Sequence, residues 1–361
     1  MSDIAHVPRS ATGRLLDLRS GWPLVGAAVL CTLVVVHWGE RMTRRVRLVG
    51  DGRNVASYGF DLTTCFVPRD LLVPARMAKD SLPALVEPET WTVARTLEYD
   101  RDLRRGHQGK YLVGTDLVLA VEVNGAARAY PVRLMNWHQV VNDTLGGRAI
   151  AITFDPLCDS AVVFDRRVAG APLELGISGL VFNSNLVLYD RQADGGGESL
   201  WGQLQFRAIA GPAAARGATL DVLPVSVVTW SQWRTRYPDG TVLAPRPGMH
   251  KLYKTSYQPY LDSEDLLFAV RPLPDGPDLK SPVIGFHVEG RWQALSLVEI
   301  VGQAEAGRWA RDFAGVRVGG LVHDHPDTLW LTADVPTVRA AAFAWQAQDY
   351  YRGPETQRGE K

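Results

Sequence analysis

The chain has 361 residues, which is enough for one large domain or two smaller ones with a sizeable core. Lys plus Arg equal Asp plus Glu at 39 each, so the chain has no net charge with which to attract polyanions, and binding to nucleic acid is not expected. Three cysteines are too few for the disulfide-dense class of secreted proteins.

Residues 21–39 form an apolar run without a charge, bracketed by Trp22 and Trp38. A helix over this run is roughly 28 Å long at about 1.5 Å per residue, close to the thickness of a bilayer core. No small-residue cleavage site follows, so an uncleaved transmembrane helix is favoured over a signal peptide. We therefore predict a single-pass membrane protein that begins with an N-terminal tail, residues 1–20. Arginines on both sides leave the orientation open.

After the span, residues 46–109 contain several prolines and are interpreted as a connector or packing extension. The pattern then becomes β-rich. Apolar runs at 117–123 and 126–131 flank Asn124-Gly125, a strong hairpin signal. A short helix is predicted at 132–141. Further strands are predicted at 149–154, 161–165, 173–175 and 186–189.

An internal echo suggests a duplication, because residues 283–295 resemble residues 119–130. Ser199-Leu200-Trp201 is likewise echoed by Thr328-Leu329-Trp330. The predicted fold is mainly β (α+β), a duplicated β-rich unit with short helices after one N-terminal transmembrane helix. Its predicted parts are a first repeat at 110–275, an abbreviated second repeat at 276–352 and a tail at 353–361. Chance similarity of two hairpins is the alternative.

Five long motifs occur in one order: AYPVRLMNWHQVVND, ITFDPLCDSAVVFDR, LGISGLVFNSNLVLYDR, ESLWGQLQFRAIAGP and VVTWSQWRTRYPDGTVL. Over about residues 60–350 the chain resembles the bacterial and archaeal family catalogued as domain of unknown function 3179. The resemblance implies export or membrane attachment, and hence a body outside the cytoplasm. Many relatives have a second Cys where this chain has Asp155, and its absence argues against a dithiol mechanism.

The candidate centre consists of Cys158, in an Asp-Pro turn, and His138, twenty residues earlier. We expect the sulfur and a ring nitrogen to lie within about 4 Å of each other in a shared pocket. One hypothesis is a mononuclear metal site of Cys158, His138 and Met135, since thiolate, imidazole and thioether together favour copper, with zinc as an alternative.

A second hypothesis is a thiol-dependent enzyme in which His138 lowers the pKa of Cys158. Ser160, Asn183 and Ser184 are then weak candidates for binding groups beside the thiol. A third hypothesis makes Cys158 a packed small side chain, or a disulfide partner of Cys65, in a non-catalytic anchored assembly or interaction module. The sequence leaves all three open and names no substrate.

Overall fold

The computed structural model describes residues 49–102, 109–193, 195–249, 253, 256–274, 278–323, 325, 327–332 and 334–352. Within these ranges, no helix has both the length and the apolar character needed to cross a bilayer. The transmembrane helix predicted at residues 21–39 and the two predicted tails lie outside the described residues.

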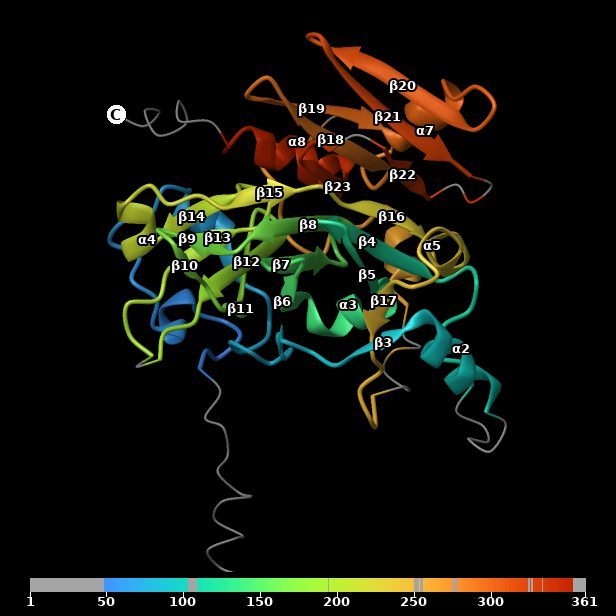
Figure 1. Cartoon of the computed structure of the whole chain (residues 1–361). Helices are drawn as coiled ribbons and strands as arrows, with labels where there is room; N and C mark the ends of the chain where they lie inside the picture. Colours follow the sequence, from blue (N-terminus) through green and yellow to red (C-terminus); the bar gives the residue numbers. More distant parts are fainter. Residues whose placement is uncertain are drawn as a thin grey trace, which may run out of the picture. The chain divides into compact units, whose positions relative to one another are not determined.

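The described chain is mainly β, with several sheets and a few short helices, which confirms the predicted class (Figure 1). One eight-stranded sheet has the order β19, β18, β23, β8, β7, β6, β2, with β15 also paired to β8. Its strands are β2 (Leu85–Val86), β6 (Val140–Leu145), β7 (Arg148–Asp155), β8 (Ser160–Asp165), β15 (Asp221–Leu223), β18 (Pro282–Val288), β19 (Arg291–Ser296) and β23 (Thr337–Ala341).

A second eight-stranded sheet has the order β20, β21, β22, β16, β4, β5, β17, β3. Its strands are β3 (Thr90–Thr92), β4 (Leu117–Val123), β5 (Ala126–Pro131), β16 (Ser226–Thr229), β17 (Thr241–Leu243), β20 (Arg308–Phe313), β21 (Val316–Val322) and β22 (Leu329–Leu331). The smaller sheets contain β1 (Leu72–Pro74), β11 (Leu175–Phe182), β12 (Asn185–Asp190), β13 (Leu200–Gly202) and β14 (Arg207–Ala210) in one, and β9 (Arg167–Val168) with β10 (Ala171–Pro172) in the other.

The helices are short and connect or cover these strands. They are η2 (Val55–Tyr58), η3 (Arg69–Leu71), α2 (Val93–Arg101), α3 (Val132–His138), α4 (Pro212–Ala215), α5 (Trp230–Arg236), α6 (Gln258–Leu261), α7 (Leu297–Gly302) and α8 (Ala342–Asp349).

The Asn-Gly hairpin forms as predicted, since β4 and β5 pair around Asn124 and Gly125, both with positive φ. The helix that follows ends at His138, three residues earlier than predicted. It stops there because Gln139 has a left-handed φ of 51° and the next residue begins β6. The segment from Gly179 to Phe182 is the end of β11, and Asn183 and Ser184 form the turn before β12.

Residues assigned to the connector enter the sheets. Strand β1 pairs with β11, β2 with β6 and β3 with β17. This part of the chain therefore closes the edges of three sheets instead of only linking elements.

The same order of elements occurs twice. A hairpin and helix, β4, β5 and α3, have a counterpart in β18, β19 and α7. A strand and helix follow later in each case, β16 with α5 and β23 with α8. Strand β16 pairs antiparallel with β4, as β23 does with β18. We propose that both sets descend from one duplicated unit.

Strand β23 joins the C-terminal elements to the rest of the chain. It pairs with β18 along five residues and with β8 through Arg339 and Ala161 (Figure 1, red beside green). Helix α8 follows directly, and its Trp345 covers Gly285 of β18. A Cβ added at Gly285 would lie 2.4 Å from the indole of Trp345.

We predict that Gly285→Ala lowers the free energy of unfolding by about 1–3 kcal/mol, because the buried indole must move to admit the methyl group. Urea unfolding followed by circular dichroism measures the change. The matched control is Gly302→Ala, where no heavy atom lies within 4 Å and φ is not in the left-handed region. The control should be neutral or stabilising by up to about 1 kcal/mol, and equal losses for both variants would contradict the close packing.

Candidate functional site

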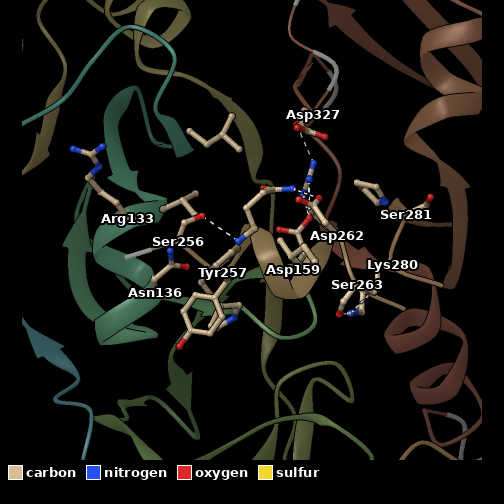
Figure 2. Close-up of a pocket in the computed structure, with 18 of the residues that line it drawn as sticks. Arg133, Asn136, Asp159, Ser256, Tyr257, Asp262, Ser263, Lys280, Ser281 and Asp327 are labelled. Carbon is tan, nitrogen blue, oxygen red and sulfur yellow. Dashed lines mark hydrogen bonds and ion pairs between the residues drawn. The ribbon is translucent and has the colours of Figure 1, made fainter. Parts of the chain in front are cut away.

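An open cleft of about 1040 Å³ lies among the described residues. Its walls come from α3, the turn between β7 and β8, residues 256–264 and residues 278–282. Figure 2 shows Arg133 and Asn136 on one side of the cleft and Lys280 and Ser281 on the opposite side. Segments far apart in sequence therefore form one site.

Helix α3 presents two faces. Val132, Arg133 and Asn136 line the cleft, whereas Met135 and His138 are fully buried on the core side. This division follows from 3.6 residues per turn, which places positions 132, 133 and 136 on one side. The motif that contains His138 thus contributes Arg133 and Asn136 to the cleft wall, whereas His138 itself does not line the cleft.

The turn after β7 depends on the buried carboxylate of Asp155. One oxygen accepts a hydrogen bond from the Leu157 N–H at 3.0 Å, and the other accepts from the Leu186 N–H at 2.8 Å and the Asn185 amide at 3.2 Å. Burial raises the pKa of Asp155, although these bonds oppose the shift. The turn brings Pro156 and Asp159 to the cleft wall.

Two cations of the cleft are held by carboxylates of the chain. Arg339 from β23 donates to Asp159 at 2.8 Å through Nε and 2.7 Å through a terminal nitrogen, and also to the Asp327 carbonyl at 2.9 Å. Arg133 donates to Asp116 at 2.8 Å. Burial raises the pKa of Asp116 despite this ion pair. These guanidinium groups are committed to internal partners.

The third cation, Lys280, binds neutral groups. Its ammonium donates to the carbonyls of Tyr260 and Ser263 at 2.6 and 2.8 Å and lies 3.7 Å from the centre of the Tyr260 ring. These bonds attach the segment that contains α6 to the chain just before β18. Lys280 therefore holds one wall of the cleft against another.

The carboxylates of the cleft outnumber its cations by six to three. Within the described part of the chain, no ion pair involves Asp262, Glu264, Asp278 or Asp327. Asp262 accepts one hydrogen bond from the Gln258 amide at 2.8 Å. The lining of the cleft thus carries an excess of negative charge.

His138 is bonded through both ring nitrogens. Nδ1 lies 2.9 Å from the Pro83 carbonyl, and Nε2 lies 3.0 Å from the hydroxyl of Tyr253. A carbonyl can only accept, so Nδ1 carries the proton and Nε2 accepts from Tyr253. Burial lowers the pKa of His138, which keeps the ring neutral. Tyr253 lines the cleft, and the buried ring of His138 holds the Tyr253 hydroxyl through this hydrogen bond.

Cys158 is also fully buried. Its sulfur donates to the Ser184 carbonyl at 3.1 Å, and its own carbonyl accepts from the Ala341 N–H at 2.7 Å. Burial first, and the charge of Asp155 second, raise the pKa of the thiol well above its ordinary value. Cys65 and Cys158 are both free thiols.

The remaining sequence candidates are buried as well. Met135 packs in a different apolar cluster from Cys158. Ser160 donates to Gln203 at 2.7 Å, and Asn183 bonds the backbone of Arg271 with both ends of its amide. Ser184 contributes its carbonyl to the Cys158 thiol. Each of these polar groups connects parts of the interior, and none lines the cleft.

The structure does not bring a set of metal ligands together in the part of the chain it describes: groups of three or more His, Cys, Asp and Glu side chains suited to one ion do not occur there. The site of Cys158, His138 and Met135 stays a prediction, and so does the Cys158 and His138 pair. Metal analysis of the purified chain, made without chelators, tests the first directly.

Sequence reasoning missed the residues that line the cleft. A signal existed for Arg133, Asn136 and Asp159, since they lie inside the same motifs as His138 and Cys158 and on the polar side of each element. No comparable signal marks residues 256–264, whose place in the cleft depends on contacts across the fold.

The family model described as "Protein of unknown function (DUF3179)" matches residues 79–319, which is more than half of the chain. The chain therefore belongs to this family. No curated protein and no solved structure matches it.

We predict that His138→Asn lowers the free energy of unfolding by about 1–3 kcal/mol at pH 8, because the Tyr253 hydroxyl loses its buried acceptor. The loss should shrink toward pH 5. Below the ordinary pKa of 6.5 the unfolded imidazole takes up a proton that the buried ring does not. Through this group, falling pH therefore destabilises the wild type and not the variant.

Urea unfolding at both pH values measures this difference. The exposed His323 provides the control, and His323→Asn should leave the pH profile of the wild type unchanged. A constant loss from pH 5 to pH 8 in His138→Asn would show that His138 is not held neutral in the folded state.

Proposed function

We propose that this member of the DUF3179 family is a binding protein whose cleft takes a polar ligand that carries positive charge. The observation that supports the proposal is the set of four carboxylates, Asp262, Glu264, Asp278 and Asp327, that border a large open cleft without an ion-pair partner in the described chain. This develops the interaction-module hypothesis.

Charge decides between classes of ligand. Two unit charges 4 Å apart interact by about 1 kcal/mol in water and about 4 kcal/mol near a protein surface. A ligand with amino or guanidino groups gains this attraction at each carboxylate, whereas a phosphate or sulfate meets repulsion from all four. Arg133 and Arg339 could not offset that repulsion, because they already bind Asp116 and Asp159. Lys280 supplies only one positive charge against the four carboxylates.

The buried candidates have a supporting role in this proposal. His138 holds the Tyr253 side chain at the cleft, and Cys158 holds the turn that carries Asp159. A thiol nucleophile or a copper ligand needs an accessible lone pair. His138 Nε2 already accepts the Tyr253 hydroxyl, and the fully buried Cys158 thiol donates its proton to the Ser184 carbonyl.

We predict that Asp262→Asn combined with Glu264→Gln weakens the binding of spermidine, used as a cationic probe, by about tenfold or ~1.4 kcal/mol. Both side chains are exposed, so the fold should not change. Isothermal titration calorimetry at low and moderate salt measures the affinity. Binding should weaken as salt screens the carboxylates.

The matched control removes the same two charges from exposed positions outside the cleft, with Asp221→Asn and Glu289→Gln. This variant should bind spermidine within about twofold of the wild type. If both double variants weakened spermidine binding equally, the effect would come from net charge and not from the cleft. If the wild type did not bind spermidine, the proposal would be overturned.

We also propose that residues 21–39 anchor the chain in a membrane and that the body faces away from the cytoplasm. The support is the length and apolar character of this run, together with the family resemblance. Tethering would hold a binding cleft near the membrane surface.

Deleting residues 1–45 is expected to release the protein from membranes, because the charge-free run lies wholly within the deletion. Fractionation of the two forms after a high-salt wash provides the measurement. A shortened chain that still sediments with membranes would show that the attachment lies elsewhere.

A further inference from the structure

A second hollow continues from the cleft. It is a groove of about 610 Å³ that shares Asp278 and Ser281 with the cleft. Val283 of β18, strand β19, helix α7 and helix α8 contribute the rest of its lining, which includes Trp292, Val298 and Trp345. A ligand too long for the acidic cleft alone could therefore extend from the cleft into this groove.

The groove runs along the edge of a sheet. Strand β19 is the last strand of its sheet, and all six of its residues pair with β18. In the described chain, the backbone of β19 makes no backbone hydrogen bond to a further element. One edge of β19 thus offers N–H and C=O groups to an added strand.

The side chains beside this edge are suited to an extended peptide. Trp292, Ala294 and Ser296 occupy alternate positions of β19 and line the groove. Trp292 meets Trp345 edge to face, with 5.7 Å between ring centres. Val298 on α7 is 71% exposed, so an apolar side chain stands open at the groove. Alternation along a strand would direct every second residue of a bound peptide toward these groups.

We propose that the groove and the cleft together bind an extended polypeptide segment of a partner protein, which adds a strand to β19 and places a basic end in the acidic cleft. The inference rests on the proposed function, since the cleft supplies the site for the basic residues. A second copy paired along β19 is the other possible occupant, but it would leave the carboxylates of the cleft without a partner.

The test uses the full chain and an acetylated, amidated peptide of two lysines followed by alternating valine and threonine, with spermidine as the probe of the cleft alone. We expect the peptide to bind at least tenfold more tightly than spermidine, because it adds backbone hydrogen bonds and apolar contact to the charge attraction. N-methylation of one alternate set of peptide residues should abolish that gain, whereas methylation of the other set should not.

The matched variants are Val298→Lys, at the groove, and Val301→Lys, on the same helix but outside the groove. Val298→Lys should weaken peptide binding at least fivefold and leave spermidine binding within about twofold. Val301→Lys should change neither. Circular dichroism confirms the fold of both variants.

Four results would overturn the inference. If the peptide bound no more tightly than spermidine, or if both lysine variants weakened peptide binding equally, the groove would not be a peptide-binding site. The proposal for the cleft would still stand. If the wild type formed a dimer and did not bind the peptide, and if Val298→Lys dissociated that dimer, the edge of β19 would bind a second copy of the chain. Binding of neither probe would remove the proposed function as well.

Discussion

A carboxylate sealed in the interior, that of Asp155, sets the geometry on which the cleft depends. Removing such a group from water is costly unless hydrogen bonds replace those of the solvent. Here two backbone N–H groups and the amide of Asn185 supply them. Because one of the backbone donors belongs to β12 and the other to the turn itself, the same carboxylate orders the end of β7 and ties it to a different sheet.

The residues that follow Asp155 extend this connection. Cys158 reaches the turn between β11 and β12 through its sulfur and reaches Ala341 of β23 through its carbonyl. Asp159, held at a left-handed φ of 42°, receives the guanidinium of Arg339 from the same strand. A single tight turn therefore contacts two other sheet regions, and its motif is dense in polar residues for structural reasons. The cleft forms where these regions meet.

The sequence predicted local features well and long-range ones poorly. The hairpin at Asn124-Gly125 was predictable because two adjacent residues determine the turn. The sequence also pointed to the motifs around His138 and Cys158, which contribute residues to the cleft wall. The partners of His138 were not predictable, since Pro83 and Tyr253 lie 55 and 115 residues from it. Spacing along the chain carries no information about such contacts, so the sequence does not reveal that the His138 imidazole bonds the hydroxyl of Tyr253.

The position of β23 has a consequence for the order in which the protein is made. This strand lies between β18 and β8, although it comes after every other strand in the part of the chain that the structure describes. During synthesis, β18 and β8 both emerge before the residues that join them. The edge of β18, and the part of the β8 edge that β15 does not cover, lack this partner until position 341 is available. Long-range pairing of this kind slows folding and leaves strand edges open to wrong partners. The nascent protein would thus benefit from a chaperone, or from rapid completion of translation, at this late stage.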